Sequence, residues 1–450
     1  METNQSTQLF SSLYEANRDK LIAGSPDFYT KLRDEAIQYF NNSGFPAKKD
    51  EKYKYTFLEP LFNNGYKKNL SPNPISFDIS EIFKCDVPSL DTHIIILLNG
   101  YYYNWRVPIT TLPNGVIYGS LAAAIKQYPE LVEKHLAKQA SVADSYLAIN
   151  MAFSNDGFFL YAPKGSKMDR PIQLINVLLS EEELMVQPRN LFILEEGSDV
   201  NIVVCDHTLS EPKFLTNSVT EVEVGENARF DYFKVQNEHN ASTQVSHTFI
   251  HQQANSNVRS MVVTLHGGLV RNNLNIKLDG EGAECYAYGM FISDKTQHID
   301  NYVFIDHAKP HCNSNQLYKG ILDDQSSGAF TGRILVDRDS QKTLAYQKNS
   351  SLLLTNDAKM AGKPQLEIYA DDVKCSHGAT VGQIDEEALF YLRSRGISER
   401  EARLMLMYAF AHEVLHEIKI DPLKIRMNEL IEKRLRGELS RCNNCAMNCR

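Results

Sequence analysis

The most informative segment of this chain is Lys363-Pro-Gln-Leu-Glu-Ile-Tyr-Ala-Asp-Asp-Val-Lys-Cys-Ser-His-Gly378. It reads as an extended strand, in which successive side chains point to opposite faces. The residues that would then share one face are Asp371, Val373, Cys375 and His377. A thiol beside an imidazole suits iron, zinc or copper, whereas carboxylates alone suit magnesium or calcium. Cys375 and His377 are therefore the first candidate ligands for metal or sulfur.

Two ligands do not complete a metal site. If Cys375 and His377 bind metal or sulfur, the remaining ligands must come from elsewhere in the chain or from a partner subunit. The alternative is structural, because a free cysteine commonly packs as a small apolar side chain and a single histidine commonly lies in a core or on a surface. Both interpretations stay open from the spacing alone.

Upstream of this segment, residues 157–374 form many short β-rich runs separated by polar turns. These turns include Glu195-Glu-Gly-Ser198, Gly225-Glu-Asn227, Ala254-Asn-Ser-Asn257 and Asp279-Gly-Glu-Gly282. They recur about every 28 residues, which is typical of a stacked β-solenoid. No long helical pattern interrupts the region, so a doubly wound α/β fold is excluded. The spacing does not separate a β-helix from a β-sandwich.

Helical patterns lie on both sides of the β-rich region. Residues 8–40 predict two helices, and three more follow Gly378. Asp385 and Ser398 are expected as N-caps of the first two of these. The second carries an apolar stripe that contains Leu406, Phe410 and Val414. We expect this helical domain to cover the open end of the solenoid and to offer those three residues as a docking surface.

Composition narrows the function. The chain has 450 residues and a formal charge of −9, which argues against a general nucleic-acid or anionic-membrane surface because both need clustered positive charge. No apolar run approaches the length of a membrane span, and the best candidate, Ile94–Leu98, is a short buried strand. The N-terminus lacks the basic and apolar regions of a secretory signal. We therefore expect a cytoplasmic protein.

The sequence His412-Glu-Val-Leu-His416 matches the zinc-peptidase pattern H-E-x-x-H, with two histidines one helical turn apart and a glutamate beside them. No third histidine follows at the expected spacing. A zinc metallopeptidase is thus kept only as an alternative, and exposed helix histidines are the structural interpretation. The tail has a second cluster, Cys442, Cys445 and Cys449, whose thiols could contact zinc or an iron–sulfur cluster or form an oxidisable end.

The run from Pro364 to Gly396 resembles the signature of the SufB/SufD family of iron–sulfur cluster assembly scaffolds, in its SufD form. Three upstream segments agree with it: Gln297-His-Ile-Asp300, Asp306-His-Ala-Lys-Pro-His-Cys-Asn-Ser314 and Gln316-Leu-Tyr-Lys-Gly320. The similarity spans about residues 145–418 and is looser before them. The second of these segments contains His307, His311 and Cys312. These three residues could be metal ligands, or they could form a hydrogen-bonded turn of the solenoid.

The resemblance implies a mainly β protein with helical ends and a right-handed parallel β-helix core. The expected boundaries are an N-terminal helical and mixed region at 1–156, the β-helix at 157–378, a C-terminal helical domain at 379–440 and a cysteine-rich tail at 441–450. It also implies a non-catalytic scaffold. The chain has no G-x-x-x-x-G-K-[ST] loop, so ATP hydrolysis would belong to a partner.

The implied partners are a SufB-like subunit, paired through the β-helix, and a SufC-like ATPase on the C-terminal helical domain. A homodimer is expected for the isolated chain. Cys375 and His377 would lie at the junction and share a nascent iron–sulfur cluster with SufB. A protonated His377 would lower the pKa of the neighbouring Cys375 thiol. Iron, persulfide sulfur and reduced flavin are candidate first contacts. A SufB-type paralogue that carries the cluster is the other alternative.

Overall fold

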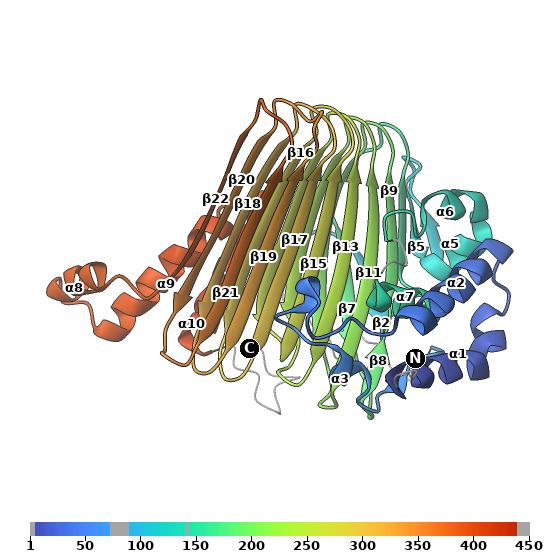
Figure 1. Ribbon diagram of the computed structural model, residues 1–450, viewed down its shortest axis with the longest axis horizontal. Helices are drawn as coiled ribbons and strands as arrows, with labels where there is room; N and C mark the ends of the chain where they lie inside the picture. Colours follow the sequence, from blue (N-terminus) through green and yellow to red (C-terminus); the bar gives the residue numbers. More distant parts are fainter. Residues whose placement is uncertain (1–4, 73–89, 141–143, 439–450) are drawn as a thin grey trace.

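The structure is a computed structural model that describes residues 5–72, 90–140 and 144–438. Its centre is a parallel β-helix built from two long sheets, with helices at both ends of the chain (Figure 1). The expected fold class is confirmed.

Each turn of the β-helix gives one strand to each sheet. Sheet A contains, in spatial order, β21 (Lys359–Ile368), β19 (Ser327–Val336), β17 (His298–His307), β15 (Leu269–Leu278), β13 (Thr243–Gln252), β11 (Phe214–Val224), β9 (Arg189–Leu194), β6 (Phe158–Ala162), β5 (Ile117–Ser120) and β4 (Ile109–Thr111), with β8 (Leu184–Val186) and β1 (Lys67–Lys68) beside β11. Sheet B contains β22 (Lys374–Gly382), β20 (Leu344–Leu353), β18 (Asn313–Leu322), β16 (Glu284–Ser293), β14 (Asn257–His266), β12 (Arg229–Asn237), β10 (Asp199–Thr208), β7 (Ile172–Leu178), β2 (His93–Leu98) and β3 (Tyr101–Tyr102).

The strand register explains the sequence period. Leu215 pairs with Thr243, 28 residues later, and Leu269 pairs with His298, 29 residues later. Side chains at equivalent positions of successive turns therefore stack directly on one another. Two boundaries differ from expectation: β2 extends sheet B from the N-terminal region, and β22 continues to Gly382, beyond the expected end at residue 378.

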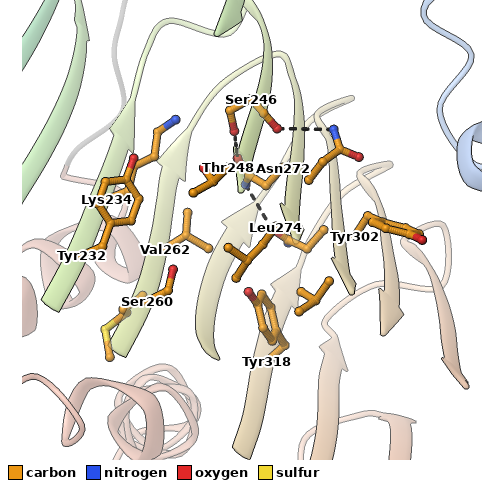
Figure 2. Close-up of a pocket in the computed structure, with 14 residues that line it drawn as sticks. Tyr232, Lys234, Ser246, Thr248, Ser260, Val262, Asn272, Leu274, Tyr302 and Tyr318 are labelled. Atoms are coloured by element: carbon orange, nitrogen blue, oxygen red, sulfur yellow. Dashed lines mark hydrogen bonds between the residues drawn. The ribbon is translucent and has the colours of Figure 1, made fainter. Parts of the chain in front are cut away.

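The space between the sheets holds apolar clusters along the β-helix, with buried polar side chains beside them. Phe158, Phe192 and Phe230 pack edge to face on successive turns. Further along, a cavity of about 30 Å³ is lined by Tyr232, Lys234, Ser246, Thr248, Asn272 and their neighbours (Figure 2). Ser246 donates a hydrogen bond of 2.8 Å to Asn272 there. Such a volume suits one or two water molecules.

The N-terminal helices cover the first turns of sheet A. They are α1 (Gln5–Ile22), α2 (Asp27–Ser43), α3 (Glu59–Phe62), α5 (Leu121–Gln127), α6 (Pro129–His135) and α7 (Ser145–Phe153), with a 3₁₀ turn at Glu51–Tyr53. Phe10, Phe40 and Phe153 pack with Leu191 and Val245 of the sheet. The segment around the 3₁₀ turn reaches the later strands of sheet A: Arg271 donates to the Lys52 carbonyl at 2.8 Å, and Glu51 pairs with Lys363.

The C-terminal helices are α8 (Glu386–Ser394), α9 (Glu399–Leu415) and α10 (Asp421–Arg436). Asp385 and Ser398 cap α8 and α9 with side-chain hydrogen bonds, as their sequence predicts. α9 and α10 pack against the outer face of sheet B, and α8 projects beyond the β-helix (Figure 1). The expected cover over the open end is wrong, because the buried side of this domain faces the flank of the solenoid. None of the described helices has the length and apolarity to cross a membrane.

Candidate functional site

The last turn of the β-helix ends in an exposed strand. β22 pairs with β20 on one side, and no strand among the described residues pairs with its other side. Eight of its nine residues are exposed, and Cys375 is half-buried. Such an edge presents unpaired backbone N–H and C=O groups to which another chain can add. The geometry therefore makes this end of the solenoid a surface that a partner could extend.

Cys375 and His377 lie at the rim of this open end. They are two residues apart on β22, so their side chains leave the strand on the same face. Cys375 lies opposite Ala345 and packs against an apolar cluster between the sheets that includes Ile334 and Val336. The shared face is therefore the inward one. His377 remains exposed and accessible to a neighbouring chain.

Two sequence-based expectations for this segment are corrected. β22 begins at Lys374, so Asp371 and Val373 lie in the preceding turn and do not belong to the strand. Burial raises the pKa of the Cys375 thiol, while a hydrogen bond from the Ala345 backbone opposes the shift. The expected lowering by an imidazolium is therefore wrong. The thiol favours its protonated form until a metal or a base removes the proton.

A buried amide ladder leads to His377 from inside the β-helix. Gln316, Gln347 and His377 occupy the same register position on β18, β20 and β22. Gln347 donates through Nε2 to Gln316 Oε1 at 2.9 Å, and both glutamines are buried. Gly332 faces this ladder, and a Cβ atom there would lie 2.0 Å from Gln347 Nε2. Sequence reasoning missed Gln347, whose signal is its offset of 31 residues from Gln316.

His307, His311 and Cys312 do not form a ligand set. His307 is fully buried, its Nε2 lies 2.8 Å from the Ser314 hydroxyl, and burial lowers its pKa to about 3. Cys312 is also buried and directs its thiol to the Gly280 carbonyl. His311 is exposed at a left-handed turn position. These residues stabilise a turn of the solenoid.

His412 lies on α9 and His416 caps its C-terminal end; both are exposed, and their ring centroids are 6.1 Å apart. Glu413 between them forms ion pairs with Lys319 and, at 2.9 Å, with Lys348. Burial opposes the shift, but hydrogen bonds from both lysines hold the pKa of Glu413 below its usual value. Within the described ranges, no group of three or more histidine, cysteine or acidic side chains could hold a metal. The glutamate is a structural anchor, so the peptidase alternative loses its general base.

The expected docking residues are mostly covered by the chain itself. Val414 is fully buried, and Leu406 and Phe410 are half-buried against sheet B. The i, i+4 stripe identified a packing face but assigned it to the wrong neighbour. The large apolar side chains that stay exposed on the helical domain are Phe390, Tyr391, Met405 and Ile425. Cys442, Cys445 and Cys449 lie outside the described residues.

Comparison with known proteins agrees with this architecture. Residues 177–410 match the family model for the SufBD core domain of the SUF system of iron–sulfur cluster assembly, and residues 4–174 match that for the SufBD N-terminal region. The chain belongs to the SufBD family. It is therefore an iron–sulfur cluster assembly protein of that family, and the match to the core model includes all of β22 at the open end.

Named relatives of this SufBD-family chain match over most of their length. An iron–sulfur cluster assembly SufBD family protein of Synechocystis is 27% identical, with 95% of this chain and 96% of the relative covered. The iron–sulfur cluster assembly protein SufD of Escherichia coli is 29% identical, over 89% and 92%. The chloroplastic protein ABCI7 of Arabidopsis thaliana is 30% identical, over 86% and 82%.

Proposed function

We propose that this SufBD-family chain is a SufD-type scaffold subunit that pairs with a SufB-type subunit through the open end of its β-helix. The observation that carries the proposal is the exposed last turn, whose inner rim presents Cys375 and His377. The named SufD relatives support the SufD assignment. A SufB-type subunit that carries the cluster on its own is the competing assignment.

The chemistry of the rim suits the assembly of a cluster shared by two chains. Cys375 offers one sulfur and His377 one nitrogen, so a partner must supply the other ligands. Because the Cys375 pKa is raised, iron binding has to displace the thiol proton, and metal binding couples to deprotonation. Iron and sulfide are cargo in this role. Reduced flavin as an electron source for the complex stays a prediction.

The surface around the rim favours a protein partner over solvent. Large apolar side chains exposed on the last two turns are those of Leu344, Tyr346, Ile368, Tyr369 and Val381. Another β-helix end that continues both sheets would bury these side chains and pair the β22 backbone. A SufB-type end is the proposed occupant, and a second copy of this chain could occupy the same edge when the partner is absent.

The helical domain is the proposed docking site of a SufC-type ATPase. Its exposed apolar residues lie on α8, α9 and α10, away from the face that packs on sheet B. Glu413 on α9 joins the domain to Lys319 on β18 and Lys348 on β20. β20 is the neighbour of β22. Movement of a docked ATPase would thus be transmitted to β20, the strand beside the rim, through the ion pairs of Glu413 with Lys319 and Lys348.

Anaerobic reconstitution tests the proposal. The chain, a SufB-type subunit and a SufC-type ATPase are combined with iron, sulfide and ATP, and cluster formation is measured by absorbance. We expect Cys375→Ala and His377→Ala to lower the yield severalfold while size-exclusion chromatography shows an intact complex. Ser376→Ala is the matched control, because Ser376 is exposed on the same strand between the two residues. Unchanged yield in both variants contradicts the proposal, and a cluster formed by this chain alone favours the SufB-type assignment.

A further inference from the structure

The amide ladder below the rim ends in an unused acceptor. Gln347 is 3% exposed, and its Nε2 is committed to Gln316 Oε1. Its Oε1 atom is buried and has no hydrogen-bond donor among the described residues. Buried carbonyl oxygens almost always accept a hydrogen bond. The free Gln347 Oε1 therefore points to a donor that binds it in another state of the protein. The next position of the ladder is occupied by His377.

We propose that Gln347 is a positioning residue for His377: its Oε1 accepts the His377 Nδ1–H when a partner chain covers the last turn. This inference rests on the proposed role of His377 at the cluster site. The hydrogen bond would hold the imidazole in one orientation and leave Nε2 unprotonated at the tip of the ring. Nε2 would then face the metal that the partner chain helps to bind.

The register supports this geometry. Gln347 already spans the gap to the preceding turn, where it reaches Gln316 at 2.9 Å. His377 lies one turn further at the same register position, and adjacent strands are spaced evenly at about 4.8 Å. In stacked amide ladders each side chain donates to the one before it and accepts from the one after it. A neutral histidine has a single N–H donor, which fits the free acceptor of Gln347.

The choice of ring nitrogen follows from where each atom lies. Nδ1 is close to the β22 backbone and hence to the neighbouring turn, whereas Nε2 is at the far tip of the ring. A metal-bound histidine usually donates its other N–H to a carbonyl or carboxylate, which fixes the tautomer. Removing such a partner typically weakens metal binding by about 10- to 100-fold.

The tautomer of His377 tests the inference without any measurement of cluster formation. The full-length chain, labelled with ¹⁵N at histidine, is assembled with its SufB-type and SufC-type partners, and the His377 signals are assigned from a His377→Asn variant. We expect Nδ1–H in the assembled wild type and the ordinary Nε2–H form in Gln347→Leu. If Gln347→Leu fails to assemble, Gln347→Asn withdraws the acceptor by one methylene and should give the same change.

Asn349→Leu is the matched control. Asn349 is equally buried on the same face of β20, but it lies opposite Ala379, which has no side-chain donor. It should leave the His377 tautomer unchanged. An Nε2–H signal in the assembled wild type, or an unchanged tautomer in both Gln347 variants, overturns the inference. The proposed function fails separately, by an unchanged cluster yield in both Cys375→Ala and His377→Ala.

Discussion

Lys319 and Glu413 form an ionic link between β18 of the β-helix and α9 of the helical domain. The Lys319 side chain is 5% exposed. Its ammonium pairs with the Glu413 carboxylate, donates to the Phe410 carbonyl at 2.9 Å and lies 4.1 Å from the Phe410 ring centroid. A buried cation is costly once its partner is removed. This relationship explains why a glutamate within an H-E-x-x-H pattern serves packing here.

Glu413→Gln should therefore weaken the attachment of α9 to sheet B. We expect the free energy of unfolding to fall by about 2 kcal/mol, less than for a fully buried pair because the Glu413 side chain is partly exposed. Urea denaturation measures the loss, and faster hydrogen exchange in α9 locates it. Glu429→Gln on α10 removes an exposed pair with Arg426 and should cost less than about 0.5 kcal/mol. Equal effects of the two substitutions would contradict the structural role of Glu413.

Asp144 gives the chain a pH-dependent contribution to stability. Burial alone would raise its pKa, but the Lys52 ammonium at 2.6 Å and hydrogen bonds from Lys52 and Tyr53 lower it to about 2. A carboxyl whose folded pKa lies below its unfolded value stabilises the protein above the unfolded pKa, near 3.9, and loses that contribution as the pH falls towards 2.

Asp144→Asn should therefore lower the stability at pH 7 by about 2 kcal/mol, and the difference from wild type should shrink as the pH falls from 4 to 2. Denaturation curves recorded across this range measure the difference. The exposed Asp357→Asn provides the comparison, with little expected change at any of these pH values. A difference for Asp144→Asn that stays constant down to pH 2 would show that the carboxylate charge is not its source.

Gly332 should tolerate no side chain, because an added Cβ atom would lie 2.0 Å from Gln347 Nε2 and 2.8 Å from the Phe330 ring. We expect Gly332→Ala to destabilise the chain by about 1–3 kcal/mol through overpacking. Gly378→Ala on the exposed edge meets no atom within 4 Å and should be close to neutral. Thermal unfolding of the two variants compares them directly, and a stable Gly332→Ala would mean that the glutamine ladder is arranged differently.

The pH dependence of Cys375 alkylation tests its environment. Burial raises the pKa of this thiol, so its thiolate fraction, and with it the rate of reaction with iodoacetamide, should rise at higher pH than for a cysteine in an unfolded peptide, about 8.5. Peptide mass spectrometry resolves Cys375 from the buried Cys205, Cys285 and Cys312. A midpoint below that of the peptide would mean that a neighbouring cation activates the thiol.

The sequence predicted what depends on local pattern. Polar turns at a regular interval predicted the stacked turns, and Asp385 and Ser398 predicted the starts of two helices, because capping requires only a few neighbouring residues. The rim pair was also found locally, since two residues on one strand share a face wherever that strand lies.

The sequence could not predict what depends on the register between turns or on which face is covered. The position of Gln347 between Gln316 and His377 follows only from the pairing of β20 with β18 and β22. The stripe containing Val414 showed that α9 has a buried side, but period alone does not say what buries it. The direction of the Cys375 pKa likewise followed from burial between the sheets, which no spacing of cysteine and histidine reveals.

A pocket at the rim that another chain completes is central to the proposed function, and the accessibility of Cys375 tests this directly. At one fixed pH, iodoacetamide labelling of Cys375 is compared between the isolated chain and its complex with a SufB-type and a SufC-type partner. Ile94→Cys, exposed at the other end of sheet B, serves as the reference thiol. We predict labelling of Cys375 about tenfold slower or more in the complex, with the reference unchanged. Equal labelling of Cys375 in both states would contradict the account.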